Sequence, residues 1–201
     1  MTLATEHDFL QQLERARPIR GWALAVSGHG EEGITQIRQA LAADRSTGST
    51  RDRPYYLALL AEASGEVGQA TEGLEALAEA LAMLPKSGVR WWEAELYRLR
   101  GELLLQSNVQ GPTSDVERMA PGLSPAVTEA ESCFQQALTV ARGQQAKSLE
   151  LRAAVSLSRL WEQQGKRAAA HELLAPIYGW FTEGVDTADL QEAKALLAEL
   201  A

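Results

Sequence analysis

Residues 21–28 read Gly-Trp-Ala-Leu-Ala-Val-Ser-Gly, and residues 61–68, forty positions later, read Ala-Glu-Ala-Ser-Gly-Glu-Val-Gly. Small and apolar residues continue the match at the same spacing: Gly33, Ile37, Ala40 and Leu41 in the first copy, and Gly73, Leu77, Ala80 and Leu81 in the second. A repeated unit of this length is typical of helix-hairpin arrays, in which each pair of helices buries its apolar stripe against its neighbours. The stretch therefore predicts a repeat protein.

Two further copies follow. The third is interrupted by an insertion within residues 107–128, and its matching residues are Gly101, Leu104, Ala130, Phe134, Ala137 and Leu138. The fourth is compact, and its matching residues are Ser158, Trp161, Gly165, Ala170, Leu174 and Ile177. Apolar residues recur at steps of three and four, which is the spacing of one helix face. Alternating β-branched runs, which would indicate strands, are missing, so we expect an all-α fold.

The pattern resembles the tetratricopeptide (TPR) repeat, in which a small residue midway along the first helix lets the two helices of a hairpin approach. The resemblance covers roughly residues 15–180 and is partial, because the spacing between copies is irregular. It implies TPR-like antiparallel helix hairpins stacked as a right-handed solenoid with a concave face.

The expected organisation is a single TPR-like domain over residues 1–201 with about four helix pairs and a C-terminal capping helix at 187–200. Pro18 is expected to break or kink the first segment, because proline removes a backbone donor inside a helix. Glycine and proline punctuate residues 108–123, so we expect a mobile inserted loop there. The predicted helices are 6–16, 18–28, 31–43, 53–67, 70–84, 88–107, 125–142, 148–164, 167–182 and 187–200.

Longer strings add a second resemblance. Residues 92–105, Trp-Glu-Ala-Glu-Leu-Tyr-Arg-Leu-Arg-Gly-Glu-Leu-Leu-Leu, and residues 174–184, Leu-Ala-Pro-Ile-Tyr-Gly-Trp-Phe-Thr-Glu-Gly, are among those that carry it. They are similar to the C-terminal helical-repeat region of large bacterial predicted ATPases, many of which carry a class III adenylate/guanylate cyclase domain. The resemblance implies a regulatory or scaffold module in signalling, without the catalytic domains themselves.

Composition narrows the possible partners. The chain has 27 acidic and 19 basic residues, a formal charge of −8, which disfavours binding to a phosphate backbone. No apolar run is long enough to span a bilayer, and the first residues do not form a leader peptide. The single cysteine, Cys133, suits a reducing compartment and is expected to be a small buried hydrophobe. We therefore expect a cytoplasmic protein that binds neither nucleic acid nor membrane.

The sequence contains one motif and three histidines that could suggest catalysis or metal binding, but their surroundings do not support either. Residues 28–33, Gly-His-Gly-Glu-Glu-Gly, match the dinucleotide-binding pattern by letter, but they follow a helical segment and carry two carboxylates that would repel phosphates. The histidines are isolated from one another and lack metal-ligand spacing. We interpret residues 28–33 as an inter-helix turn and expect no enzyme activity, no metal and no cofactor.

The candidate binding site follows from the TPR resemblance, which places certain positions of each first helix on the concave face. The polar and aromatic residues at these positions are Trp22, Tyr55, Glu62, Glu66, Glu95, Arg98, Glu102, Gln106, Arg152, Arg159, Glu162 and Gln163. Their mixed charge suits a polar peptide or protein surface. Solvation of the groove by charged side chains is the alternative explanation.

Aromatic residues provide a second candidate surface. Most of the five tryptophans are expected to pack in the core. Tyr178, Trp180 and Phe181 differ, because they lie near the end of the array, where the final helix could cap them or a second copy of the chain could dock. The sequence thus predicts a noncatalytic protein-interaction or scaffold module. A small-molecule sensor, with its ligand in the superhelical groove around Trp22 and Tyr55, is the alternative.

Overall fold

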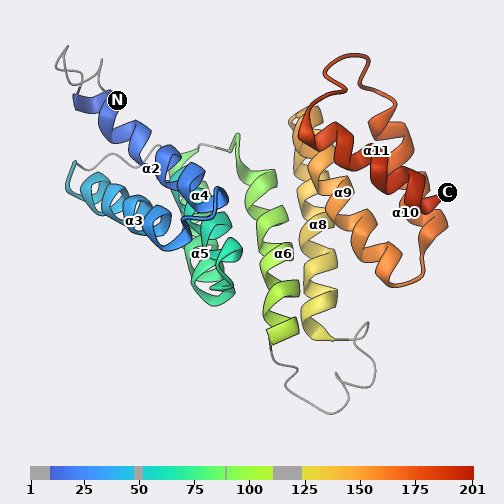
Figure 1. Ribbon diagram of the computed structural model, residues 1–201, viewed down its shortest axis with the longest axis horizontal. Helices are drawn as coiled ribbons and strands as arrows, with labels where there is room; N and C mark the ends of the chain where they lie inside the picture. Colours follow the sequence, from blue (N-terminus) through green and yellow to red (C-terminus); the bar gives the residue numbers. More distant parts are fainter. Residues whose placement is uncertain (1–9, 48–51, 89, 111–123) are drawn as a thin grey trace. The chain divides into compact units, whose positions relative to one another are not determined.

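The computed structural model describes residues 10–47, 52–88, 90–110 and 124–201 (Figure 1). All regular elements in these ranges are helices: α2 (Leu10–Val26), α3 (Gly30–Thr47), α4 (Arg53–Glu66), α5 (Ala70–Ser87), α6 (Glu93–Gln110), α8 (Pro125–Gly143), α9 (Lys147–Gln163), α10 (Arg167–Tyr178) and α11 (Ala188–Leu200). The all-α prediction is confirmed.

The helices form two compact units, residues 1–92 and 93–201. In the first unit α2 pairs with α3 and α4 pairs with α5, while α4 also packs on α2 and α3. In the second unit α6 pairs with α8 and α9 with α10, while α9 also packs on α6 and α8. Helix α11 packs on α9 and α10. Each unit therefore contains two stacked hairpins, with α2, α4, α6 and α9 as the first helices, here called the inner helices.

Small residues set the distance between paired helices, as the repeat pattern requires. A Cβ atom added to Gly21 would lie 2.7 Å from the carbonyl oxygen of Gly33, and one added to Gly33 would clash with the carbonyl oxygen of Gly21. At the same place in the fourth hairpin, the Ser158 hydroxyl donates to the carbonyl of Ala170 at 3.2 Å. The hairpins are thus held together by close backbone approach, around which larger side chains pack.

The core of each unit is built from the repeat positions predicted to be apolar. The four equivalent side chains of the second helices are at most 1% exposed: Ile37, Leu77, Phe134 and Leu174. The alanines that follow at the next repeat position, Ala40, Ala80 and Ala137, are also buried. Removal of this apolar surface from water, at about 25 cal/mol per Å², drives the stacking of hairpins.

Helix boundaries differ from the predicted ones at several places. Residues 10–26 form one helix through Pro18, so the predicted break at this proline is wrong. The Pro18 ring is less than 2% exposed, and burial of this apolar ring offsets the loss of one helical hydrogen bond. Trp91 and Trp92 form a turn before α6 rather than its first residues.

Two further boundaries concern the ends of the second unit. Helix α6 extends to Gln110, beyond the predicted start of the inserted loop, and residues 111–123 of that loop lie outside the described residues. Helix α10 ends at Tyr178, earlier than predicted, and Pro176 lies in its last turn. Because proline has no N–H to donate to the carbonyl four residues earlier, its place here agrees with a helix that ends two residues later.

Candidate functional site

The inner helices of the second unit share a buried network of charged side chains. Glu95 is 2% exposed, and its two carboxylate oxygens accept hydrogen bonds from Arg98 at 2.6 and 2.9 Å. Arg98 also forms an ion pair with Glu102, one turn further along α6. A buried charge is tolerated only when it is paired and hydrogen-bonded, and here the bidentate geometry meets that condition.

Helix α9 completes the network from the neighbouring hairpin. Arg152 lies 2.9 Å from the Glu95 carboxylate, and the Ser156 hydroxyl donates to Glu102 at 2.9 Å. Two carboxylates on α6 are thus balanced by one arginine from each helix. The network fixes how the two inner helices sit against each other.

The remaining predicted residues of this unit are more accessible. Gln106 is exposed near the end of α6, and so is Gln163 near the end of α9. Arg159 is exposed and lies 2.9 Å from Glu192 of α11, whereas Glu162 pairs with Arg167 at 3.6 Å. The predicted groove residues of unit two therefore divide into a buried set, Glu95 and Arg98, and an accessible set that a partner could contact.

The first unit uses aromatic side chains where the second uses arginines. The Trp22 indole donates to Glu62 at 2.7 Å and thereby joins α2 to α4. Tyr55 contacts the two tryptophans that end this unit, with ring centroids 5.4 Å from Trp91 and 5.2 Å from Trp92. The predicted residues of this unit thus make two separate contacts. Trp22 of α2 bonds to Glu62 of α4, and Tyr55 of α4 packs on Trp91 and Trp92.

The expectation of core packing is wrong for Trp91, which is 51% exposed. Trp180, which was set apart from the core tryptophans, is 58% exposed. Trp180 stacks edge-on against Phe181 with centroids 5.0 Å apart, and the Lys147 ammonium lies 5.8 Å from its ring centre. Both exposed indoles are therefore held in place by neighbours rather than by burial.

One electrostatic effect is resolved on the inner face of unit one. Burial raises the pKa of the Tyr55 hydroxyl, and the negative charge of Glu62 raises it further. Tyr55 and Glu62 are seven residues apart on α4 and so share one face of the helix. The charge of Glu62 therefore adds to the effect of burial at the Tyr55 hydroxyl.

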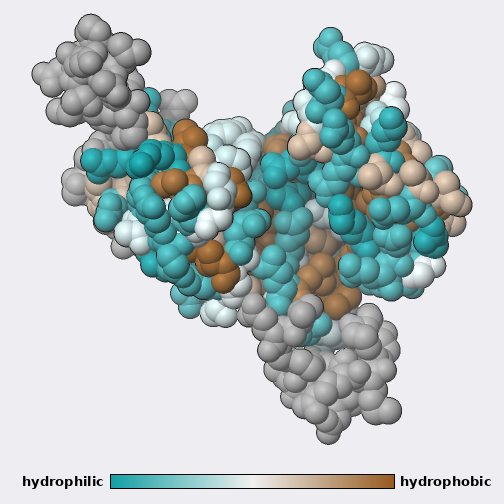
Figure 2. Space-filling view, viewed as in Figure 1, coloured by the Kyte–Doolittle hydropathy of each residue, from teal (hydrophilic) through white to brown (hydrophobic). Residues whose placement is uncertain are grey.

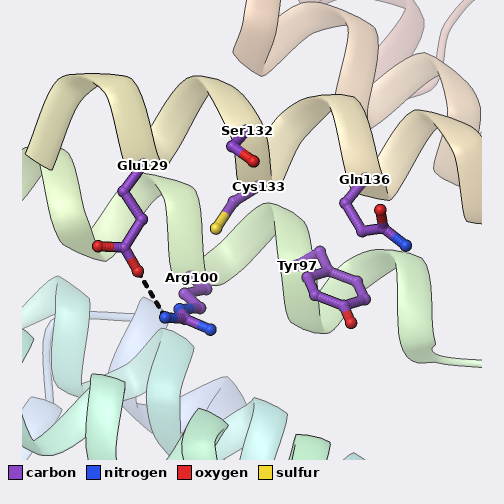
Figure 3. A pocket seen from close by; sticks show the side chains of 6 residues that line it. All are labelled: Tyr97, Arg100, Glu129, Ser132, Cys133 and Gln136. Atoms are coloured by element: carbon purple, nitrogen blue, oxygen red, sulfur yellow. Dashed lines mark hydrogen bonds and ion pairs between the residues drawn. The ribbon is translucent and has the colours of Figure 1, made fainter.

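An open hollow lies between α6 and α8, with a volume of about 370 Å³ (Figure 3). Its lining residues are Tyr97, Arg100, Glu129, Ser132, Cys133 and Gln136. Arg100 and Glu129 form an ion pair across it at 2.5 Å. None of these residues belongs to the predicted groove. The hollow is therefore a different place from the one expected for a small ligand, around Trp22 and Tyr55.

Cys133 faces this hollow from α8 (Figure 3) and is 7% exposed, as expected for a small buried hydrophobe. Burial raises the pKa of its thiol; nearby Arg100 opposes this shift, and Glu129 adds to it. A thiol with a raised pKa has little thiolate at neutral pH and is a poor nucleophile.

The glycine motif at residues 28–33 lies between α2 and α3, with a helix on each side. Gly28 adopts a positive φ of 91°, and the His29 amide donates to the carbonyl of Leu24 at 2.9 Å, so this segment closes the hairpin. In the described ranges, no group of three or more His, Cys, Asp and Glu side chains could hold a metal ion. No helix in the described part of the chain is both long and apolar enough to cross a membrane.

Sequence reasoning missed two anchors that join helices. Arg53 is 5% exposed; it donates to Glu79 of α5 at 2.7 and 2.9 Å and to the carbonyl of Leu41 at 2.9 Å. Glu150 accepts from Arg142 at 2.9 Å and from Lys147 at 2.7 Å. Arg53 and Glu79 lie 26 residues apart and follow no helical spacing, so no sequence signal could have paired them.

Hydrophilic side chains cover most of the visible surface of each unit, and hydrophobic atoms show in separate patches (Figure 2). A patchwork of this kind suits polar recognition better than a broad apolar interface. The accessible residues of the inner helices, together with Trp91, are therefore the candidate interaction surfaces.

Comparison with known proteins supports the fold. No family model matches the chain. The crystal structure of kinesin light chain nearly identical TPR-like repeats from Podosopora anserina aligns with a TM-score of 0.61 at 19% identity, covering 92% of this chain and 84% of that one. A single-substitution variant of the same repeats aligns with the same TM-score at 20% identity and the same coverage. The chain therefore has a TPR-like repeat fold.

One sequence relative is an uncharacterized protein of Rhizobium meliloti (strain 1021), which is 32% identical over 119 residues. The match covers 59% of this chain but 11% of the relative, so most of that protein lies outside it. The chain is thus similar to one part of a much longer bacterial protein.

Proposed function

We propose that this chain is a noncatalytic protein-interaction or scaffold module that binds a protein or peptide along its inner helices. The observation that carries the proposal is the side-by-side arrangement of inner helices within each unit, α2 with α4 and α6 with α9. These helices present polar and aromatic side chains rather than a continuous apolar face. Repeat proteins use extended surfaces of this kind to bind partners.

The proposed contact residues are those of the predicted groove, with roles that depend on their burial. Glu95 and Arg98 shape the surface from beneath, because both are buried and paired. The direct contacts come from the more accessible members: Trp22, Tyr55, Glu62, Glu66, Glu102, Gln106, Arg152, Arg159 and Glu162.

Site-specific photo-crosslinking in the source cell tests the proposal. A photoreactive amino acid is placed at Gln106 or Arg159, which are exposed on inner helices, and in control variants at Thr139 or Glu172, exposed on α8 and α10. We expect crosslinked partner proteins from the two inner-helix positions and not from the controls. Equal thermal melting of all four variants shows that the fold is retained.

Two outcomes would contradict the proposal in different ways. Crosslinks that form only from Thr139 or Glu172 would place binding on the outer helices and reject the inner face. A complete lack of partner crosslinks from all four positions would reject the interaction function itself.

We further propose that the module is a regulatory region of a larger signalling protein, as its resemblance to cyclase- and ATPase-associated repeats implies. The Rhizobium meliloti relative supports this, because the matched region is a small part of it. An antibody against this chain should detect, in the source cell, a polypeptide much longer than 201 residues. Detection of a 201-residue product alone would reject this part of the proposal.

Self-association through Tyr178, Trp180 and Phe181 is a further part of the proposal. The exposed Trp180 ring, fixed by Phe181 and Lys147, is the anchor that a second copy would contact. Sedimentation velocity of the wild type and of Trp180→Ala measures this. A dimer that the substitution converts to monomer is the expected result, and an unchanged sedimentation coefficient would exclude this surface.

A further inference from the structure

The hollow between α6 and α8 brings together side chains that the proposed protein-binding surface does not use (Figure 3). Its volume of about 370 Å³ lies at the lower end of the range for small-molecule sites, about 300–1,000 Å³. Helix α6 contributes Tyr97 and Arg100, about one turn apart, and α8 contributes the other four lining residues. A molecule in the hollow therefore contacts both helices of one hairpin.

An ion pair lies at one end of the hollow (Figure 3). Arg100 donates one hydrogen bond, from Nη2 to a carboxylate oxygen of Glu129, at 2.5 Å. The two side chains are 39% and 48% exposed, and neither makes a further hydrogen bond or ion pair with a residue that the structure describes. The remaining N–H groups of the guanidinium and the second carboxylate oxygen are thus accessible to a ligand.

The other end of the hollow carries an aromatic ring and neutral polar groups, from Tyr97 and Gln136 (Figure 3). Cys133 lies between the two ends and is the most buried of the lining residues. The side chains of Tyr97, Ser132 and Gln136 make no hydrogen bond with any described residue. This end therefore offers an aromatic face and a thiol for apolar contact, with hydroxyl and amide groups beside them.

We propose that this hollow binds a free α-amino acid with an aromatic side chain. The ammonium and carboxylate of an α-amino acid are attached to the same carbon atom, so they match the adjacent opposite charges of Arg100 and Glu129. The ligand's carboxylate accepts hydrogen bonds from Arg100, and its ammonium donates to Glu129. Its aromatic ring packs over Cys133 and against the ring of Tyr97.

The pairing of charges in the hollow favours a zwitterion over a simple ion. A carboxylate without an ammonium is attracted by Arg100 but repelled by Glu129, and an amine without a carboxylate experiences the reverse. Partly exposed charges are also screened by salt, so a single contact of this kind is weak. A ligand that makes both contacts at once therefore binds more tightly than one that makes either alone.

Isothermal titration calorimetry of the full chain with L-phenylalanine tests this inference. We expect saturable binding with a Kd below about 1 mM, which is within reach of a ligand of this size. Two analogues are the matched ligand controls: 3-phenylpropionate lacks the ammonium, and 2-phenylethylamine lacks the carboxylate. Each should bind at least about fivefold more weakly, because one charged hydrogen-bonded contact is lost. Absence of binding by L-phenylalanine, or equal binding of either analogue, would overturn the inference.

Variants of the ion pair show whether the ligand binds in this hollow. Arg100→Met and Glu129→Gln should each raise the Kd of L-phenylalanine at least about fivefold. Arg38→Met is the matched control, because it breaks another partly exposed arginine–glutamate pair, that of Arg38 with Glu72. This control should change the Kd by less than about twofold, as expected for a surface change away from the site. Circular dichroism melts verify that the three variants fold. An unchanged Kd in both ion-pair variants, or an equal rise in Arg38→Met, would exclude the hollow.

Cys133 provides a second measurement at the site itself, because it is the single cysteine of the chain. Alkylation of its thiol by N-ethylmaleimide is followed with and without L-phenylalanine. At about ten times the Kd, the rate should fall about tenfold, because only unoccupied chains react. Binding by calorimetry without protection of Cys133 would place the ligand elsewhere and overturn the inference. None of these outcomes decides the proposed protein-binding function, because the hollow shares no residue with the predicted groove.

Discussion

At the scale of single residues, Arg98 shows that a repeat position alone does not establish whether a side chain is accessible. The TPR positions correctly place Glu95, Arg98 and Glu102 on one helix, but position alone does not reveal that Arg98 is 6% exposed. Two carboxylates of its own helix, Glu95 and Glu102, pair with it, and Arg152 of α9 pairs with the same Glu95. A charge-reversal experiment on Arg98 would therefore test folding rather than binding.

Replacement of Arg98 by methionine should destabilise the protein by about 3 kcal/mol, because it leaves the buried Glu95 carboxylate with Arg152 as its remaining cation. Chemical denaturation of the wild type and the variant measures the change. The double variant Glu95→Gln, Arg98→Met should recover much of the loss, since no buried charge is then left unpaired. Arg159→Met, at an exposed position, is the control and should stay within about 0.5 kcal/mol of the wild type.

Glu150 should make the stability of the second unit depend on pH in the acid range. Burial raises the pKa of this carboxyl, but hydrogen bonds and charges from Lys147 and Arg142 outweigh burial, and the net pKa is lowered. A lowered folded-state pKa stabilises the fold at pH values above the unfolded pKa, and this contribution is lost as pH falls through the folded value. Glu150→Gln should therefore flatten the loss of stability below about pH 4.5, near the usual glutamate pKa. Acid titrations followed by circular dichroism check this, and parallel curves for both proteins would contradict it.

At the scale of elements, the repeat pattern predicted which helices pair, because close approach needs small residues at fixed places. Gly21 with Gly33, and Ser158 with Ala170, meet where the pattern requires. Helix ends were less predictable. The passage of α2 through Pro18 depends on burial of the proline ring, and burial depends on neighbours that local sequence does not specify.

A side chain at the crossing of α2 and α3 should force these helices apart. Gly33→Ala is expected to destabilise the protein by about 2 kcal/mol or more, because the added Cβ would overlap the Gly21 carbonyl oxygen and the Ala25 backbone. Gly143→Ala, at the end of α8, meets nothing within 4 Å and is expected to be neutral or stabilising by up to about 1 kcal/mol. Denaturation midpoints give both values. Equal midpoints for the two variants would show that the α2–α3 crossing accommodates the added methyl group without loss of stability.

The turn between α2 and α3 should not respond to nucleotides, despite its three glycines. A phosphate site of this type needs free amides after a strand, whereas the His29 amide here donates to Leu24 and Glu31 and Glu32 add negative charge. Titration with ATP or NAD should leave the melting temperature unchanged. A saturable rise at micromolar concentration would contradict this expectation.

At the scale of the whole molecule, the sequence predicted the all-α, TPR-like fold class but did not indicate the two compact units. That division follows from contacts between residues far apart in the chain, which no periodicity encodes. The candidate binding residues, such as Trp22, Tyr55 and Glu62, remain a prediction from the repeat positions. The contact of Trp91 with Tyr55 could not be predicted, because it depends on the turn before α6.

Far-UV circular dichroism should show well over half of the residues in helices, far above the ~30–35% of an average globular protein. The expectation follows from the helices that fill most of the described ranges. A substantial strand component in the spectrum would be incompatible with stacked hairpins.

The five tryptophans also make the protein well suited to nuclear magnetic resonance. The indole protons of Trp22 and Trp161 are engaged with Glu62 and Glu131, so their signals should lie downfield and exchange slowly with solvent. The exposed indole rings of Trp91 and Trp180 should give fast-exchanging signals. One slow and one fast reporter thus belong to each unit, and an added peptide that broadens the Trp91 signal but not the Trp180 signal would identify its binding unit without any chemical label on the peptide.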